Sequence, residues 1–257
     1  NYTFDVNIPL QQLESKAYIE FYLEGNKTRI KLDLNFARPL SRLNADEYSY
    51  WNVGQYTLNY RNSSILILKR TALRTLKREL KYLKYLLNSR DRQIKKCASL
   101  RIKYFLTKPF FRKKIWLFED KIYKAGDNGE YLYNYAIKKK DKIKKYYILS
   151  KNSIDSKRFE KQGKKYVDYG TTLHKLLLLN SDIVFETHNN LTVHHSFDEK
   201  IEKHFRGLFN SKNVCIQHGL TVQYIPHLTN RINDNLKAFF LASPIEYKNM
   251  LDKEYDY

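Results

Sequence analysis

Residues 114–149 read KIWLFEDKIYKAGDNGEYLYNYAIKKKDKIKKYYIL, and this stretch decides the fold class. Apolar side chains fill Ile115–Phe118 and again Tyr146–Leu149, whereas Glu130–Lys138 between them has the spacing of a helix. A short apolar run, a helix and a second apolar run are typical of two parallel strands joined by a crossover helix. The stretch therefore predicts an α/β domain with a parallel sheet.

The same alternation continues to the end of the sequence and predicts a Rossmann-like domain of about six strands over residues 113–257. Ligands of such sheets gather at the carboxyl ends of the strands, so the loops 119–129, 187–197 and 218–235 are expected to line one crevice. The remaining expected elements are the strand Tyr166–Asp168, the helix Thr171–Leu179, and the strands Ile183–Glu186, Val214–Gln217 and Leu236–Leu241.

Residues 1–70 have a different pattern, in which apolar and polar side chains alternate with a period of two. This alternation is typical of half-buried strands, and Gly25–Asn26 provides hairpin residues between two of the runs. We expect a small antiparallel domain, arranged as a sandwich. Its apolar runs are Tyr2–Leu10, Ala17–Leu23, Ile30–Phe36, Tyr56–Tyr60 and Ile65–Leu68.

Residues 71–112 are expected to form a basic helical linker between these two domains. Residues 71–114 hold 15 Lys or Arg against two acidic residues, and five leucines recur among them at helical spacing. One interpretation is a pair of basic amphipathic helices lying on anionic lipid. The other is that the leucines pack on a neighbouring domain while the lysines face water. The leucines are Leu73, Leu76, Leu80, Leu83 and Leu87, and the candidate contacts to membrane or polyanion are Arg74, Lys77, Arg78, Lys81 and Lys84.

The composition limits the classes of partner. The 257 residues include 47 Lys or Arg and 27 Asp or Glu, a net charge of +20 that attracts nucleic acid, anionic lipid or a phosphate polymer. The absence of RNP, KH and zinc-finger signatures disfavours nucleic acid. No run approaches the roughly 20 apolar residues of a membrane span, so a soluble or membrane-peripheral protein is expected. Cys97 and Cys215 show no ligand spacing, and because the only methionine is Met250 we expect a piece of a longer protein.

Several motifs of residues 113–257 occur in an order that resembles one known family. They are Lys114–Phe118, Asp127-Asn128-Gly129, Lys145–Leu149, Tyr169-Gly170 with His174–Leu179, Ser181–Val184, Cys215-Ile216-Gln217-His218-Gly219 and Ser243–Glu246. Together they resemble the CDP-glycerol glycerophosphotransferase (teichoic acid polymerase) family. The preceding strands and basic helices resemble, less closely, the region before this domain in some relatives. Ser243, Pro244 and Glu246 also fit a capping box, for which a structural role suffices.

Two departures from the family pattern leave specific contacts open. Gly126 stands where many members have an Arg before Asp-Asn-Gly, so any phosphate contact of that Arg is in doubt here. Residues 220–222 read Leu-Thr-Val where many relatives have Thr-Pro-Leu, so the acceptor could differ.

The resemblance implies a GT-B architecture, of which residues 113–257 would be the N-terminal, acceptor-side half. The nucleotide-binding domain would follow it and lies outside this sequence. The implied reaction moves glycerol phosphate, or a related polyol phosphate, from CDP-glycerol or CDP-ribitol to a hydroxyl of a teichoic-acid or capsule-type polymer. CMP is released and no cofactor is implied. The expected partners are this donor, a phosphate-polymer or lipid-linked acceptor, and the anionic cytoplasmic face of the cell membrane. The alternative is a non-catalytic basic module that docks on anionic membrane or phosphate polymer.

His218 is the candidate catalytic residue. It ends a predicted buried strand and opens a loop at the crevice, and an imidazole titrates near neutral pH. The resemblance implies that a His-Gly motif supplies the base, and Gly219 would let the backbone approach substrate closely. A histidine that only caps the strand end is the alternative. His188 follows another strand and is a candidate for substrate contact or for loop stabilisation.

Asp127, Asn128 and Gly129 are candidates for substrate binding at the start of a helix. Backbone N–H groups there could receive an anion, and Asp127 could bind an acceptor hydroxyl. The alternative is an ordinary N-cap. His188, His194 and His195 lie within eight residues, but they match no recognised zinc pattern, so no metal site is predicted.

Overall fold

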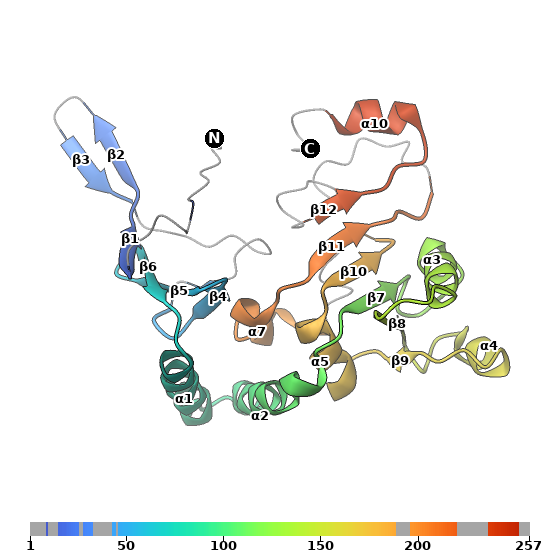
Figure 1. The fold of residues 1–257 in the computed structure, drawn as a ribbon, viewed down its shortest axis with the longest axis horizontal. Helices are drawn as coiled ribbons and strands as arrows, with labels where there is room; N and C mark the ends of the chain where they lie inside the picture. The colour runs from blue at the N-terminus through green and yellow to red at the C-terminus, as the bar shows by residue number, and fades with distance from the viewer. Residues whose placement is uncertain are drawn as a thin grey trace.

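A six-stranded parallel sheet forms the centre of the C-terminal half of the protein (Figure 1). The structure is a computed structural model that describes residues 9, 15–25, 28–32, 43–44, 46–188, 196–219 and 236–251. The strand order is β12-β11-β10-β7-β8-β9, and every neighbouring pair is parallel. This confirms the predicted α/β class. The strands are β7 (Ile115–Glu119), β8 (Lys144–Leu149), β9 (Val167–Asp168), β10 (Ile183–Glu186), β11 (Lys212–Cys215) and β12 (Leu236–Phe239).

Helices cover both faces of this sheet because apolar side chains alternate along its strands. In β7, Ile115 and Leu117 join a core with α5, whereas Phe118 joins a second core with α3 and Phe159 of α4. The helices are α3 (Asn128–Ile137), α4 (Ser156–Lys161), α5 (Thr172–Asn180), α7 (Glu199–Glu202) and α10 (Pro244–Met250), with a 3-10 turn η3 (Arg206–Leu208).

Four antiparallel strands form a separate sheet in the order β1-β6-β5-β4, and β2 and β3 form a hairpin. The predicted antiparallel character of this region is therefore confirmed. Apart from Pro9, the run Tyr2–Leu10 lies outside the described residues, as does most of Ile30–Phe36, so the sandwich stays a prediction. The strands are β1 (Lys16–Ile19), β2 (Tyr22–Gly25), β3 (Thr28–Lys31), β4 (Tyr50–Val53), β5 (Tyr56–Arg61) and β6 (Ser64–Lys69).

Two helices, α1 (Ala72–Asn88) and α2 (Arg92–Thr107), follow β6 and are extended by the turn η2 (Lys108–Phe110). The leucine stripe of α1 is not its inward face. The helix buries Glu79, Tyr82 and Leu86 instead. Four of the five leucines are between 53% and 60% exposed, and these are Leu73, Leu76, Leu80 and Leu87. These four residues are therefore not covered within this chain, and both interpretations of the stripe stay predictions.

A buried ion pair sets which face of α1 points inward. Arg101 of α2 donates from Nε and Nη2 to the two carboxylate oxygens of Glu79, at 2.7 and 2.6 Å. Tyr50 of β4 also donates to Glu79, and Arg101 Nη1 donates to the backbone oxygen of His204, after α7. One network thus joins the antiparallel sheet, both helices and the α/β region. The division at residues 70 and 112 stays a prediction, and the core crosses both positions.

His204 makes the stability of this junction depend on pH. Its buried ring lies 3.2 Å from Tyr82 Oη, and burial together with the charges of Lys203 and Arg101 lowers the pKa of His204 to about 4. The unfolded chain binds this proton near pH 6.5 and the folded chain does not, so stability is complete above pH 6.5 and falls toward pH 4. Between pH 7.5 and pH 5 we expect this group to remove about 2 kcal/mol.

Urea unfolding of the wild type and of His204→Gln at these two pH values measures the effect. The variant should lose about 2 kcal/mol less than the wild type over the interval. Equal losses in both proteins would show that His204 does not titrate with unfolding.

Candidate functional site

The carboxyl ends of β7, β10 and β11 meet at one edge of the parallel sheet (Figure 1). Glu186, the last residue of β10, is in register with Glu119 of β7 and with Cys215 of β11. The residues that follow these strands are therefore neighbours. The described parts of the three expected loops begin at this edge, whereas 189–195 and 220–235, with Asn189, His194 and His195, lie outside the described residues.

His188 and His218 stack on each other at this edge. Their ring centroids are 4.1 Å apart and their planes differ by 3°. His218 is exposed and His188 is half-buried, so the ring of His218 is open to an incoming molecule. The structure thus brings together two histidines that were predicted from separate strands.

A backbone carbonyl fixes the tautomer of His218. Its Nδ1 lies 3.1 Å from the oxygen of Thr187, and because a carbonyl oxygen can only accept, Nδ1 carries the proton. In the neutral ring the lone pair is then on Nε2, which is the atom a general base uses. Thr187 also places its Oγ1 3.1 Å from Nδ1 of His188. Thr187 was not predicted as a site residue, because its contact with His218 is made by its backbone.

The Asp-Asn-Gly turn is tied to the loop that holds His218. The Asn128 side-chain amide donates to the backbone oxygens of Gln217, at 2.8 Å, and Ile216, at 3.2 Å. Gln217 has a φ of +51° and Gly219 a φ of +152°, a region that disfavours side chains. Asn128 therefore holds two carbonyl groups of the bent backbone that leads into His218.

Asp120, which was not predicted as a site residue, stabilises the Asp-Asn-Gly turn. Its carboxylate accepts from the backbone N–H groups of Gly129, at 2.8 Å, and of Asp127 and Glu130, at 3.1 Å each. Tyr147 of β8 donates to it at 2.7 Å. Burial raises the pKa of Asp120, and these donors oppose the rise. A carboxylate directly after a buried strand, seven residues before Asp127, was the available signal.

Gly129 is required by this close packing. A Cβ at that position would lie 2.3 Å from Asp120 Oδ1 and 2.7 Å from the backbone oxygen of Glu119. Asp127 acts as the N-cap of α3 and accepts from the N–H of Asn128 at 2.8 Å. The N–H groups considered for anion binding thus already have partners inside the protein. Substrate contacts of Asp127, Asn128 and Gly129 stay predictions.

A small cavity of about 110 Å³ lies beside the turn and is lined by Lys121, Lys124, Ala125, Gly126 and Asp127. Gly126 adopts a φ of +97°, which a glycine tolerates and an arginine does not favour. Lys121 and Lys124 thus line the same cavity as Gly126, the position at which many relatives are expected to have an Arg.

Two ion pairs anchor α3 to α4 and to the segment that follows α4. Glu130 accepts from both Nη atoms of Arg158, at 2.9 and 2.6 Å, and from Lys164 at 2.8 Å. Burial opposes ionisation of Glu130, but these hydrogen bonds outweigh it and lower the pKa of Glu130 to about 2. The helix that carries Asn128 is therefore tied to α4 and to the segment after it.

On the other face of the sheet, His174 of α5 contacts the end of β7. The N–H of Gly170 donates to His174 Nδ1 at 3.1 Å, so the ring proton is on Nε2, which lies 3.7 Å from Glu119 Oε1. Both side chains are buried. The described residues contain no group of three or more His, Cys, Asp or Glu arranged to hold a metal ion.

Comparison with known proteins gives the family. The family model of CDP-glycerol:poly(glycerophosphate) glycerophosphotransferase matches residues 100–237, which is more than half of the chain. The chain belongs to this glycerophosphotransferase family. The match runs from α2 to β12 and so includes every element that positions the two histidines. It confirms the family resemblance of the sequence motifs.

A curated relative extends the similarity to the rest of the chain. The minor teichoic acid biosynthesis protein GgaB of Bacillus subtilis (strain 168) is 33% identical over 261 residues, which covers 99% of this chain. The chain spans 29% of the length of that relative. No solved structure matches the chain.

Proposed function

We propose that this chain is the acceptor-side part of a glycerophosphotransferase of teichoic acid biosynthesis, with His218 as the general base. In the proposed step an acceptor hydroxyl oxygen attacks the phosphorus of the glycerol phosphate in CDP-glycerol or a related CDP-polyol. The bond from that phosphorus to the bridging oxygen of CMP breaks, and CMP leaves with that oxygen. Nε2 of His218 takes the hydroxyl proton.

The geometry of His218 is the observation that supports this assignment. The ring is exposed at the carboxyl edge of the sheet, and the Thr187 carbonyl directs the Nε2 lone pair away from the backbone. A positioned base of this kind contributes about 10²–10⁴ to a rate. Loss of CMP release in His218→Ala, assayed in the full-length protein, tests the assignment.

The other site residues have proposed roles around this base. His188 shields one face of the His218 ring and contacts substrate beside it. Asn128 positions the His218 loop, Gly219 permits close approach, and Asp127 and Gly129 shape the acceptor side of the turn. Lys121 and Lys124 supply positive charge near the reacting phosphate, where it stabilises developing negative charge.

The donor is proposed to bind in a second Rossmann-like domain of a GT-B enzyme, without a cofactor. Two features support this. The family acts on a CDP-linked polyol by its description, and this sequence has no Gly-rich nucleotide fingerprint of its own. A capsule-type polymer remains the alternative acceptor to teichoic acid.

A second function, docking on an anionic membrane at its cytoplasmic face, is favoured by the surface of α1. A groove of about 780 Å³ between α1 and α2 is lined by Leu76, Leu80 and Leu106, all more than half exposed. Of the five basic residues predicted for this contact, Arg78 is half-buried and Arg74, Lys77, Lys81 and Lys84 are exposed. An apolar face beside a basic face suits lipid headgroups. Among the described residues, no helix has the length and apolar character to cross a bilayer.

Sedimentation with phosphatidylglycerol-containing vesicles measures this docking. The double variant Lys77→Gln/Lys81→Gln should bind about 30-fold more weakly, because each basic residue near an anionic surface contributes about 1 kcal/mol. Lys157→Gln, an exposed lysine of α4, is the matched control and should bind like the wild type. Equal binding of all three proteins would exclude α1 as the docking surface.

A further inference from the structure

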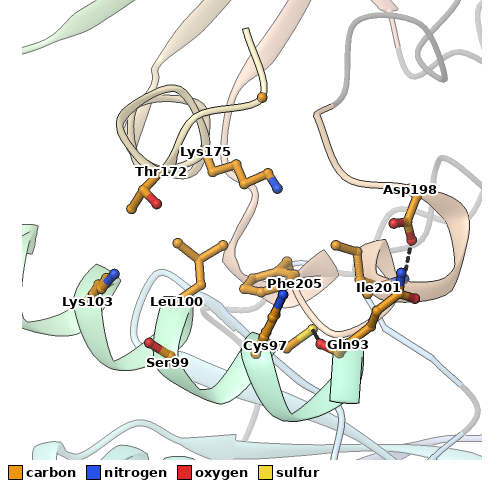
Figure 2. A pocket seen from close by; sticks show the side chains of 12 residues that line it. Gln93, Cys97, Ser99, Leu100, Lys103, Thr172, Lys175, Asp198, Ile201 and Phe205 are labelled. Carbon is orange, nitrogen blue, oxygen red and sulfur yellow. Dashed lines mark hydrogen bonds between the residues drawn. The ribbon is translucent and has the colours of Figure 1, made fainter. Parts of the chain in front are cut away.

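A second cavity lies on the face of the sheet that α5 covers, between α2, the first turn of α5 and the α7 segment (Figure 2). Its volume is about 390 Å³, within the range of small-ligand sites. None of the residues predicted to bind substrate lines it. Its side chains divide into a charged group and an apolar group.

Three lysines give the cavity a positive charge. Lys96 and Lys103 come from α2 and Lys175 from α5, and Figure 2 shows Lys175 extending across the cavity. Within the described part of the chain, none of the three forms an ion pair. Asp198 is the acidic residue of the lining, and it already accepts from the N–H of Ile201 at 3.2 Å as the N-cap of α7. The cavity therefore has a surplus of positive charge.

Apolar side chains form the other part of the lining. Leu100, Ile201 and Phe205 lie opposite Lys175, and Cys97 is beside them (Figure 2). The hydroxyls of Ser99 and Thr172 add two groups that can donate hydrogen bonds. Cations next to apolar side chains suit a ligand in which phosphate alternates with short carbon segments.

We propose that this cavity binds one phosphodiester unit of the polymeric acceptor. The lysines would hold the phosphate, and Leu100, Ile201 and Phe205 would contact the carbons of the adjacent polyol or sugar. The identity of the polymer rests on the proposed function, whereas the binding of a phosphodiester rests on the cavity itself. Charge-assisted hydrogen bonds to phosphate are among the stronger polar contacts in proteins.

The first turn of α5 connects this cavity to the carboxyl edge of the sheet. Gly170 lines the cavity and donates to His174, and His174 Nε2 lies 3.7 Å from Glu119 at the end of β7. Thr171 caps α5 by accepting from the N–H of His174 at 3.3 Å. The same turn thus touches the cavity and the end of a strand beside the histidine pair.

Isothermal titration of this chain with a synthetic glycerol phosphate tetramer tests the proposal directly. Lys175→Met keeps the length of the side chain and removes its charge, so it should weaken binding about tenfold. Asp198→Asn keeps a capping residue and removes the negative charge, so it should strengthen binding about threefold. Lys157→Met is the matched control and should bind within about twofold of the wild type.

The outcomes separate the possible sources of the phosphate. Tetramer binding that is unchanged in both Lys175→Met and Lys103→Met, with circular dichroism showing folded proteins, would overturn the proposal. A loss confined to phosphatidylglycerol vesicles, with tetramer binding intact, would assign the cavity to lipid and also overturn it. These titrations need neither donor nor turnover, so their outcome does not depend on which residue is the catalytic base. Failure of the cavity is therefore distinguishable from failure of the proposed catalytic base.

Discussion

His218→Ala is expected to reduce glycerol phosphate transfer about 10³-fold while leaving the affinity for CDP-glycerol nearly unchanged. The variant removes Nε2, the atom proposed to accept the hydroxyl proton, and leaves the Thr187 carbonyl without its Nδ1–H donor. Donor affinity is retained because the proposed donor site lies in another domain. CMP release by the full-length protein gives the rate, and equilibrium titration with CDP-glycerol gives the affinity.

Chemical rescue distinguishes the loss of the base from the loss of the loop conformation that positions it. Added imidazole should restore part of the rate of His218→Ala, because a small base can occupy the space of the ring. It should not restore Asn128→Ala, in which His218 is present and the hydrogen bonds to Gln217 and Ile216 are gone. Wild-type turnover in His218→Ala would remove this residue from the mechanism.

Arg101→Met is expected to lower the free energy of unfolding by about 3–5 kcal/mol, because it leaves the carboxylate of Glu79 buried without a cation. The lost contacts include both hydrogen bonds to Glu79 and the one to the His204 carbonyl. Since this network joins the antiparallel sheet to the α/β region, the loss should weaken both together.

Urea unfolding compares this variant with Arg92→Met, an exposed arginine of the same helix that should change stability by less than about 0.5 kcal/mol. The double variant Arg101→Met/Glu79→Gln removes both charges and should regain part of the loss. Equal stabilities of Arg101→Met and Arg92→Met would mean that the buried pair does not stabilise the junction.

The parallel sheet could be predicted because its strands are buried on both faces and read as apolar runs. Ile183–Glu186 was predicted at its observed bounds. β11 was placed two residues late, because Ile216 and Gln217 are buried although the strand ends at Cys215. An apolar run in the sequence indicates which residues are buried, but it does not show which of them pair with a neighbouring strand. The short helix α4 was missed because its six residues lack a helical apolar pattern.

Site residues at strand ends were easier to predict than residues whose role depends on contacts that form only in the folded protein. His188 and His218 each follow an apolar run, and the structure brings them together. Asp120 was not predicted, because its four donors come from a turn and from a neighbouring strand and only its position after a strand was visible in the sequence. In α1 the leucine stripe predicted an amphipathic helix correctly. Its inward face is set instead by the Glu79–Arg101 pair, which only the tertiary structure shows.

The pH dependence of single-turnover transfer tests the central role of His218 most directly. In the wild type, the rate should rise with pH with a logarithmic slope of one and then level off, because only the neutral imidazole accepts the proton. The residual rate of His218→Ala should lack this rise. An identical acidic limb in both enzymes would contradict the account, since the titrating base would then be another group.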